Sequence, residues 1–174
     1  MTSGSLGDLV ALATTIGDLL KKRAQTVGVA ESSAGGLISA TLLAVPGASA
    51  YFMGGGVIYT QAARRGLLQV GDDQVKGIRS SSEPYALVKA IAIRERLGTT
   101  WGLSETGATG PTGNRYGDAA GHACIAVAGP VERVITLETG AGDREKNMWA
   151  FTRAALGLFE ACVRETAEAQ KKEA

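Results

Sequence analysis

One stretch near the amino terminus restricts the possible folds of this chain more than any other. Residues 27–30 form a short apolar run, a polar turn closed by Gly35 and Gly36 follows, and a second apolar run covers 37–45. Strand, glycine-rich turn and helix in this order are typical of α/β proteins. Such an order directs backbone N–H groups at the start of the helix toward an anion.

Two neighbouring serines, Ser32 and Ser33, lie in this turn. Either hydroxyl can cap the following helix, and the spacing alone favours that structural role. Either can also be a nucleophile exposed at the carboxyl end of the strand. Both interpretations stay open at the level of the residues.

The rest of the chain alternates between helical and extended patterns. Apolar spacing and capping signals predict helices over 6–23, 36–44, 61–68, 82–97 and 144–167. Strands are predicted over 27–30, 55–59, 101–104, 121–127 and 131–137, and the last two read as a hairpin. We therefore expect a three-layer α/β/α sandwich with a mixed central sheet, formed by residues 1–174 as a single domain with a frayed tail at 168–174.

The helix predicted over 82–97 has clear boundaries. Ser82 is the expected cap and Gly98 ends the helix. Leu87, Val88, Ile91 and Leu97 are expected to form its apolar face.

Composition argues against several classes of function. Lys and Arg total 18 against 17 Asp and Glu, a net charge of +1, which gives no basis for binding nucleic acid or a membrane surface. The two cysteines, Cys124 and Cys162, form no CxxC pattern, and we expect buried thiols and no zinc or other metal site. No signal peptide or membrane-spanning run is visible, so we expect a cytoplasmic protein.

Several polar residues next to predicted strands are candidates for a site. The segment 106–111 offers hydroxyls and free N–H groups, which favours phosphate or ribose binding. Glu31 and Glu105 each end a strand; we expect them to be solvated, with a role as a general base as the alternative. The only histidine, His122, lies in a strand-like run and is expected to be packed structurally.

Six segments, taken in order, resemble a known family. Residues 30–36, AESSAGG, are similar to its A-E-S-C-T-G-G signature, and 45–52, VPGASAYF, to V-P-G-S-S-A-Y-F. The remaining matches are GGVIY at 55–59 with Leu67 and Leu68, SEP at 82–84, TGATGP at 106–111 and GDR at 142–144. Together they resemble the CinA C-terminal domain family, the nicotinamide-mononucleotide deamidases, over nearly the whole chain.

The resemblance implies hydrolysis of the carboxamide of nicotinamide mononucleotide to nicotinic acid mononucleotide and ammonia, without a cofactor. A serine nucleophile, a lysine and a tyrosine perform this reaction in the family. Ser32 corresponds to the serine and Tyr59 to the tyrosine, whereas Arg64 occupies the position of the lysine. The family also implies a homo-oligomer.

Arg64 is a departure with chemical consequences. Arginine stays protonated in proteins and cannot accept a proton from Ser32, although it can neutralise a phosphate or an oxyanion. Met148 is a second departure, at a position where the family often has arginine. The alternative function is therefore a catalytically weakened relative that binds a nucleotide or a protein partner without turnover.

The substrate-binding residues are predicted on the same motifs. They are Ser33, Gly35, Gly36, Thr106, Gly107, Thr109, Gly110 and Arg144, and the ligand is a small nucleotide. Some of these positions have simpler interpretations. Ser33 can be a cap, Tyr59 an edge aromatic residue, Arg64 part of a solvated helix face, and the glycines tight turns.

Overall fold

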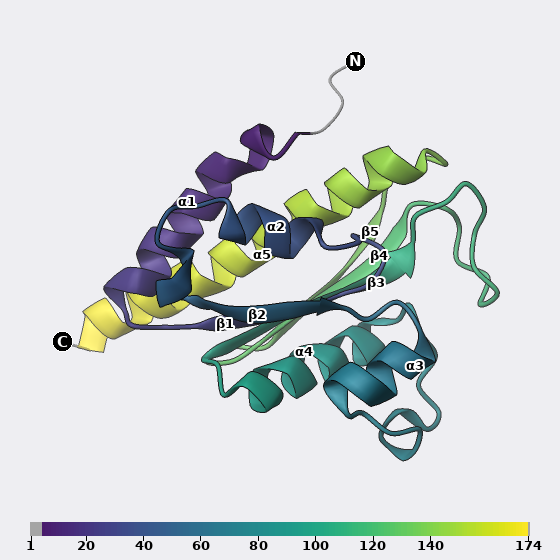
Figure 1. Cartoon of the computed structure of the whole chain (residues 1–174), viewed down its shortest axis with the longest axis horizontal. Coiled ribbons are helices and arrows are strands. Elements are labelled where there is room, and N and C mark those ends of the chain that lie inside the picture. The colour runs from purple at the N-terminus through teal and green to yellow at the C-terminus, as the bar shows by residue number, and fades with distance from the viewer. Residues whose placement is uncertain (1–4, 174) are drawn as a thin grey trace.

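The computed structural model describes residues 5–173, and its centre is one five-stranded sheet (Figure 1). The strands lie in the order β2-β1-β3-β4-β5. Their bounds are β1 Val27–Glu31, β2 Phe52–Val57, β3 Trp101–Ala108, β4 His122–Ala128 and β5 Arg133–Glu138. β1 pairs in parallel with β2 and β3, whereas β4 is antiparallel to β3 and β5. The predicted mixed sheet and terminal hairpin are confirmed.

Helices cover both faces of this sheet, which confirms the predicted three-layer sandwich. In Figure 1, α1, α2 and α5 lie on one side of the sheet, and α4 and α3 lie on the other. The helices are α1 Gly7–Lys22, α2 Leu37–Leu43, α3 Gln61–Ala63, α4 Glu83–Leu97 and α5 Arg144–Glu173, with short helical turns at Ala48–Ala50, Arg64–Leu68 and Asp73–Val75. Across residues 5–173, no helix combines the length and the apolar character needed to cross a bilayer.

The path of the chain creates a crevice at the end of β1. The chain leaves β1 through α2 to reach β2, then returns through α4 on the opposite face to reach β3. Connections that start on opposite faces leave a gap at the carboxyl ends of the strands, where α/β proteins bind ligands. This geometry positions the turn that contains Ser32.

The two faces of the sheet are packed differently. The face toward α1, α2 and α5 carries large side chains, and Trp101 meets Phe159 edge to face with ring centroids 5.8 Å apart. The face toward α4 carries small ones: Ala86 and Ala90 of the helix against Cys124 and alanines of β4. A Cβ atom on Gly102 would lie only 1.9 Å from the Ala90 carbonyl oxygen, so glycine is what lets α4 approach β3 this closely.

The buried face of α4 differs from the predicted one. Its cap at Ser82 and its end at Gly98 are as expected. The buried side chains are Tyr85, Ala86, Lys89, Ala90 and Ile93, whereas Leu97 is 38% exposed. Because α4 approaches β3 closely, only the side of the helix that carries the alanines fits against the strand. The bulkier leucines of α4 lie at the edge of this contact.

Several element boundaries also differ. β2 begins at Phe52, before the predicted 55–59, and ends at Val57, because it pairs with β1 from Val27 to Glu31. β3 continues beyond the predicted 101–104 to Ala108, because β4 pairs with it as far as His122. The predicted helix 61–68 is α3 followed by a π-helical turn. The frayed tail stays a prediction, and Ala174 lies outside the described residues.

Candidate functional site

A cavity of about 460 Å³ opens at the carboxyl ends of β1, β2 and β3. This size suits a nucleotide-sized ligand. The cavity is lined mainly by hydroxyl, phenol and amide groups from five segments of the chain: Ser32, Ile58, Tyr59, Thr60, Gln61, Ser80, Ser81, Tyr85, Thr106, Gly107, Asn114, Arg115 and Tyr116.

Four of the predicted site residues line this cavity, and the others do not. Ser32, Tyr59, Thr106 and Gly107 belong to its wall. The predicted residues outside the wall are Ser33, Gly35, Gly36, Arg64, Thr109, Gly110 and Arg144. Gly107 has a packing role as well, since a Cβ there would lie 2.2 Å from the His122 carbonyl oxygen.

Glu105 holds the turn after β1 from within the protein. Its Oε2 accepts hydrogen bonds from the backbone nitrogens of Ser32 at 3.0 Å and Ala34 at 2.8 Å. The Ser33 hydroxyl donates to Oε1 of the same carboxylate. Ser33 is therefore buried and hydrogen-bonded to Glu105, whereas Ser32 faces the cavity.

Glu31 holds the start of α2 in a similar way. Its carboxylate accepts backbone N–H groups of Gly36, Ile38 and Ser39 at 2.8–3.0 Å and the Ser39 hydroxyl at 2.5 Å. Burial raises the pKa of Glu31, and the hydrogen bonds with Ser39 and Ile38 oppose that rise.

The predicted exposure of Glu31 and Glu105 is therefore wrong, because both side chains are fully buried. The expectation that this turn offers its N–H groups to an external anion is also corrected. Five of those groups already bond the protein's own carboxylates. Buried backbone donors need partners, and here the partners come from strand ends.

Arg64 is absent from the wall of this cavity and lines an adjoining cavity of about 360 Å³, which shares Gln61, Ser80, Tyr85 and Tyr116 with it. Its guanidinium donates to the Gly71 carbonyl oxygen at 2.8 Å and to the Asp72 carboxylate, which also accepts from Arg65. Only 2% of Arg64 is exposed, so the solvated helix face is a wrong prediction for this residue. The π-helical turn Arg64–Leu68 directs the side chain inward, and the loop around Asp72 closes over it.

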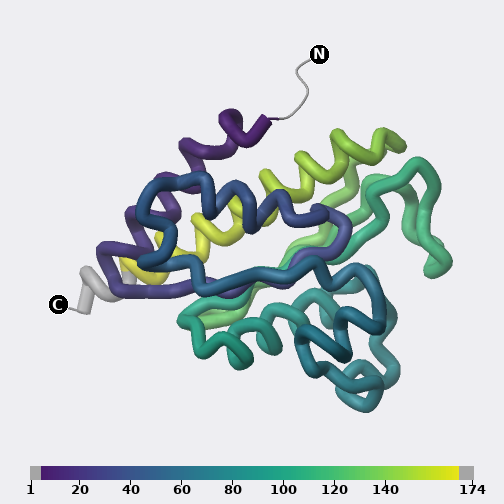
Figure 2. The backbone as a smooth tube through the Cα atoms, viewed as in Figure 1, coloured from purple at the N-terminus to yellow at the C-terminus, as the bar shows by residue number. Residues whose placement is uncertain are grey.

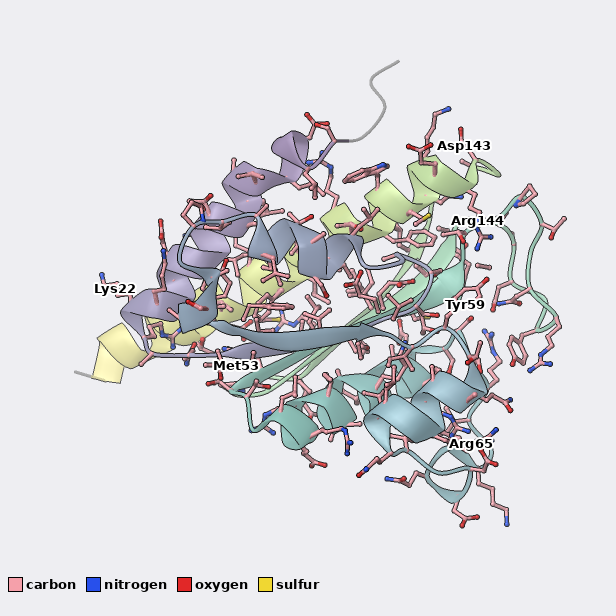
Figure 3. The ribbon with its side chains drawn as sticks, viewed as in Figure 1. Lys22, Met53, Tyr59, Arg65, Asp143 and Arg144 are labelled. Carbon is pink, nitrogen blue, oxygen red and sulfur yellow. The ribbon has the colours of Figure 1, made fainter. Side chains whose placement is uncertain are left out.

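Arg144 connects three segments at the rim of the cavity. Its guanidinium donates to the Gly110 carbonyl oxygen at 2.6 Å and to the Tyr59 hydroxyl oxygen at 3.2 Å. Figure 3 shows Arg144 and Tyr59 near each other at one end of the molecule, with Met53 at the other end of β2. A cation is thus held beside a cavity-lining phenol.

The sequence reasoning missed the loop between β3 and β4, which supplies three residues to the cavity. Figure 2 shows this loop projecting from the body of the molecule. Its residues Asn114, Arg115 and Tyr116 line the cavity, and Asp118 anchors it through two bonds to Arg79. Hydrogen bonds with Ser80 and then Arg115 lower the pKa of the Tyr116 phenol.

Lys89 is the other residue that was missed. It is fully buried, and its Nζ donates to the Glu105 backbone carbonyl oxygen at 2.8 Å. Burial lowers the pKa of Lys89 to about 8, although the charges of Glu105 and Glu31 oppose that shift. A lysine in the alanine-lined stripe of α4 was the available signal in the sequence.

A second group resembles a nucleophile, base and orienting acid but is not exposed to the cavity. Cys124 Sγ lies 3.5 Å from His122 Nε2, and His122 Nδ1 lies 2.5 Å from the Glu138 carboxylate. The thiol is buried, and this burial raises the pKa of Cys124, which disfavours the reactive thiolate. His122 also bonds the Ser81 carbonyl oxygen at 2.9 Å, so it connects β4 to the cavity wall.

A metal site is not evident in the described part of the chain. Residues 5–173 contain no cluster of three or more His, Cys, Asp or Glu side chains arranged to hold an ion. The buried carboxylates of Glu31 and Glu105 are bonded to backbone N–H groups.

Comparisons with known proteins agree with this architecture. A "CinA-like protein" of Nostoc sp. is 36% identical over 132 residues, and one of Cyanothece sp. is 42% identical over 120 residues. These alignments cover 76% and 69% of this chain but 31% and 29% of the relatives, so the chain spans about a third of their length.

Solved structures give the same result. The competence/damage inducible protein CihA from Agrobacterium tumefaciens has 29% identity and a TM-score of 0.81, covering 92% of this chain and 98% of that one. A CinA superfamily protein from Klebsiella pneumoniae shares the fold, with 24% identity, a TM-score of 0.83 and coverage of 90% and 98%. The family described as CinA C-terminal domain matches residues 9–163. This chain therefore belongs to the CinA C-terminal domain family.

Proposed function

We propose that this protein hydrolyses the carboxamide of nicotinamide mononucleotide through Ser32. The observation that carries the proposal is the position of Ser32, which follows β1 directly and faces a cavity of about 460 Å³. Neighbouring Ser33 is bound to a buried carboxylate, so only Ser32 of the pair faces a ligand. The turn after a central strand is where α/β proteins place exposed nucleophiles.

The cavity lining suits each part of such a substrate. The rings of Tyr59, Tyr85 and Tyr116 offer surfaces on which a pyridine can stack. Arg115 in the wall and Arg144 at the rim supply cations for a phosphate. The side chain of Gln61 and the hydroxyls of Thr60 and Thr106 offer polar groups for ribose hydroxyls or the carboxamide.

The proposed reaction proceeds in two steps. Ser32 Oγ adds to the carboxamide carbon, its proton passes through a base to the amide nitrogen, and ammonia leaves as the acyl–serine ester forms. Water then hydrolyses the ester to the carboxylate and restores Ser32. Because arginine stays protonated, Arg64 is not the base, and the proposed base is a tyrosine oxygen of the wall, from Tyr59 or Tyr116.

A second candidate function is nucleotide binding without turnover. One observation favours it: the described residues of the cavity wall include no carboxylate, histidine or lysine. A missing general base typically lowers the rate by a factor of about 100 to 10,000. Binding requires only the aromatic and cationic groups, which are in place.

Ammonia release and thermal shift separate these candidates. The hydrolase predicts ammonia from nicotinamide mononucleotide in wild type, with a loss of at least about a thousandfold in Ser32→Ala. The exposed Ser5→Ala is the matched control. The binder predicts a nucleotide-dependent rise in melting temperature without ammonia. Turnover gained only in Arg64→Lys would favour the binder as a weakened enzyme, and neither turnover nor a shift would reject both.

A further inference from the structure

Three ionisable groups lie buried together beneath the turn that carries Ser32. Glu31, Glu105 and Lys89 have no exposed surface, and they come from β1, β3 and α4. Two carboxylates and one ammonium thus share the interior. Charges in the interior need partners, because desolvation is otherwise too costly.

The two carboxylates fix the main chain on either side of Ser32. Glu105 accepts the N–H groups of Ser32 and Ala34, and Glu31 accepts those at the start of α2. A charged acceptor bonds such donors more strongly than a neutral one. The position of the Ser32 backbone therefore depends on the Glu105 side chain accepting these hydrogen bonds.

Lys89 supports Glu105 from the opposite layer of the sheet. β1 and β3 pair as far as Ala30 and Ser104, so Glu105 lies just beyond this register, where the strands separate. Lys89 Nζ donates to the Glu105 carbonyl oxygen at 2.8 Å. The ammonium thereby fixes the main chain that carries the carboxylate.

The positive charge of Lys89 is attracted to both carboxylates, which repel each other. The groups whose charge acts on Lys89 are Glu105 of β3 and Glu31 of β1, and both oppose the lowering of the pKa of Lys89 by burial. With that pKa at about 8, the side chain is mainly an ammonium at neutral pH. Removing it would leave two buried carboxylates without a counter-charge.

We propose that Lys89 is a positioning residue: its buried ammonium holds the main chain of Glu105 in place, and Glu105 in turn holds the turn that presents Ser32 to the cavity. Lys89 contacts no ligand in this arrangement. The effect on catalysis rests on the proposed function, whereas the effect on the turn does not.

Amide hydrogen exchange of Ser32 and Ala34 tests the turn directly, without a substrate. In Lys89→Met, which keeps the side-chain length without the charge, we expect both amides to exchange about tenfold faster or more at pH 7. Ile125 in β4 should keep its protection. The exposed Lys76→Met is the matched control. Unchanged protection of Ser32 and Ala34 in a folded Lys89→Met would overturn the proposal.

Two further arms keep the test decisive if Lys89→Met unfolds. The double variant Lys89→Met with Glu105→Gln removes both charges and keeps an acceptor, so we expect it to fold and to protect the Ser32 and Ala34 amides. In wild type, the protection of these amides relative to Ile125 should fall as the pH rises through about 8. A double variant no better folded than Lys89→Met, or constant relative protection, would contradict the proposal.

Activity adds a separate readout. If wild type releases ammonia, its pH profile should decline through about pH 8, and the double variant should lack this decline. If wild type releases none, the proposed function fails while the exchange results still decide the role of Lys89. The two failures are therefore distinguishable.

Discussion

The Glu105 carboxylate lies 3.0 Å from the backbone nitrogen of Ser32 and accepts its hydrogen. Because of this contact, the backbone N–H group of Ser32 is already bonded within the protein, although the sequence of the turn is typical of an anion-binding site. A substrate phosphate cannot use these donors without displacing Glu105. In the proposed function, the phosphate binds Arg115 in the wall and Arg144 beside Tyr59 instead.

Ser32 and Ser33 should differ sharply when each is replaced by alanine. Ser33→Ala leaves one oxygen of the buried Glu105 without its donor, and we expect it to lower the free energy of unfolding by about 1–3 kcal/mol. Ser32→Ala should change that quantity by less than about 0.5 kcal/mol. Urea denaturation of both variants measures the difference, and equal effects would contradict the assigned roles.

Glu31→Gln should loosen the start of α2. The amide would turn an N–H₂ group toward the backbone N–H groups that Glu31 now accepts, so we expect a loss of about 1–3 kcal/mol in the free energy of unfolding. The exposed Glu132→Gln is the matched control and should be close to neutral. Denaturation curves of the two variants that coincide would show that Glu31 does not cap the helix.

Two glycines should respond in opposite ways to replacement by alanine, because only Gly102 lies in the contact between α4 and β3. Gly102→Ala would drive a Cβ into the Ala90 carbonyl oxygen, and we expect a loss of about 3 kcal/mol or more in the free energy of unfolding. Gly157→Ala, in open space within α5, should add about 0.5–1 kcal/mol. Thermal denaturation that ranks Gly102→Ala at or above wild type would refute this packing.

His122 should make stability depend on pH. Burial would lower the pKa of His122, but hydrogen bonds with Glu138 and Ser81 and the charge of Asp118 outweigh it, so this pKa is raised above 6.5. A raised histidine pKa stabilises the fold below the unfolded value and loses that contribution as the pH rises through the folded value.

The test compares wild type with His122→Gln. The excess free energy of unfolding of wild type should be larger at about pH 6 than at about pH 8.5. The variant itself is the control, because every other titrating group is common to both proteins. An excess that is constant or grows with pH would show that His122 is not held as an imidazolium.

The strands, the hairpin and the capped ends of α4 were predictable because each leaves a local signal. Ser82 and Gly98 bracket α4, and a glycine follows β1, β3, β4 and β5 within a few residues. The burial of the polar side chains was not predictable from such local signals. Glu31, Glu105 and Arg64 are ordinary surface residues by type, and only the packing of distant segments buries them.

The residues of the candidate site also divide into those that the sequence identified and those that it did not. Ser32 was a candidate because it directly follows a predicted strand, and Tyr59 was identified through the resemblance to the family motif; both line the cavity. Arg115 and Tyr116 come from a loop of irregular sequence, and no periodic pattern locates such a loop over a cavity. Lys89 acts across the sheet, so its partners became identifiable only in three dimensions.

The most direct test is ammonia release from nicotinamide mononucleotide by wild type, Ser32→Ala and Ser5→Ala. We expect wild type and Ser5→Ala to release ammonia and to form nicotinic acid mononucleotide. A Ser32→Ala protein that remains folded should release none. Release that persists unchanged in Ser32→Ala would show that the Ser32 hydroxyl is not the nucleophile.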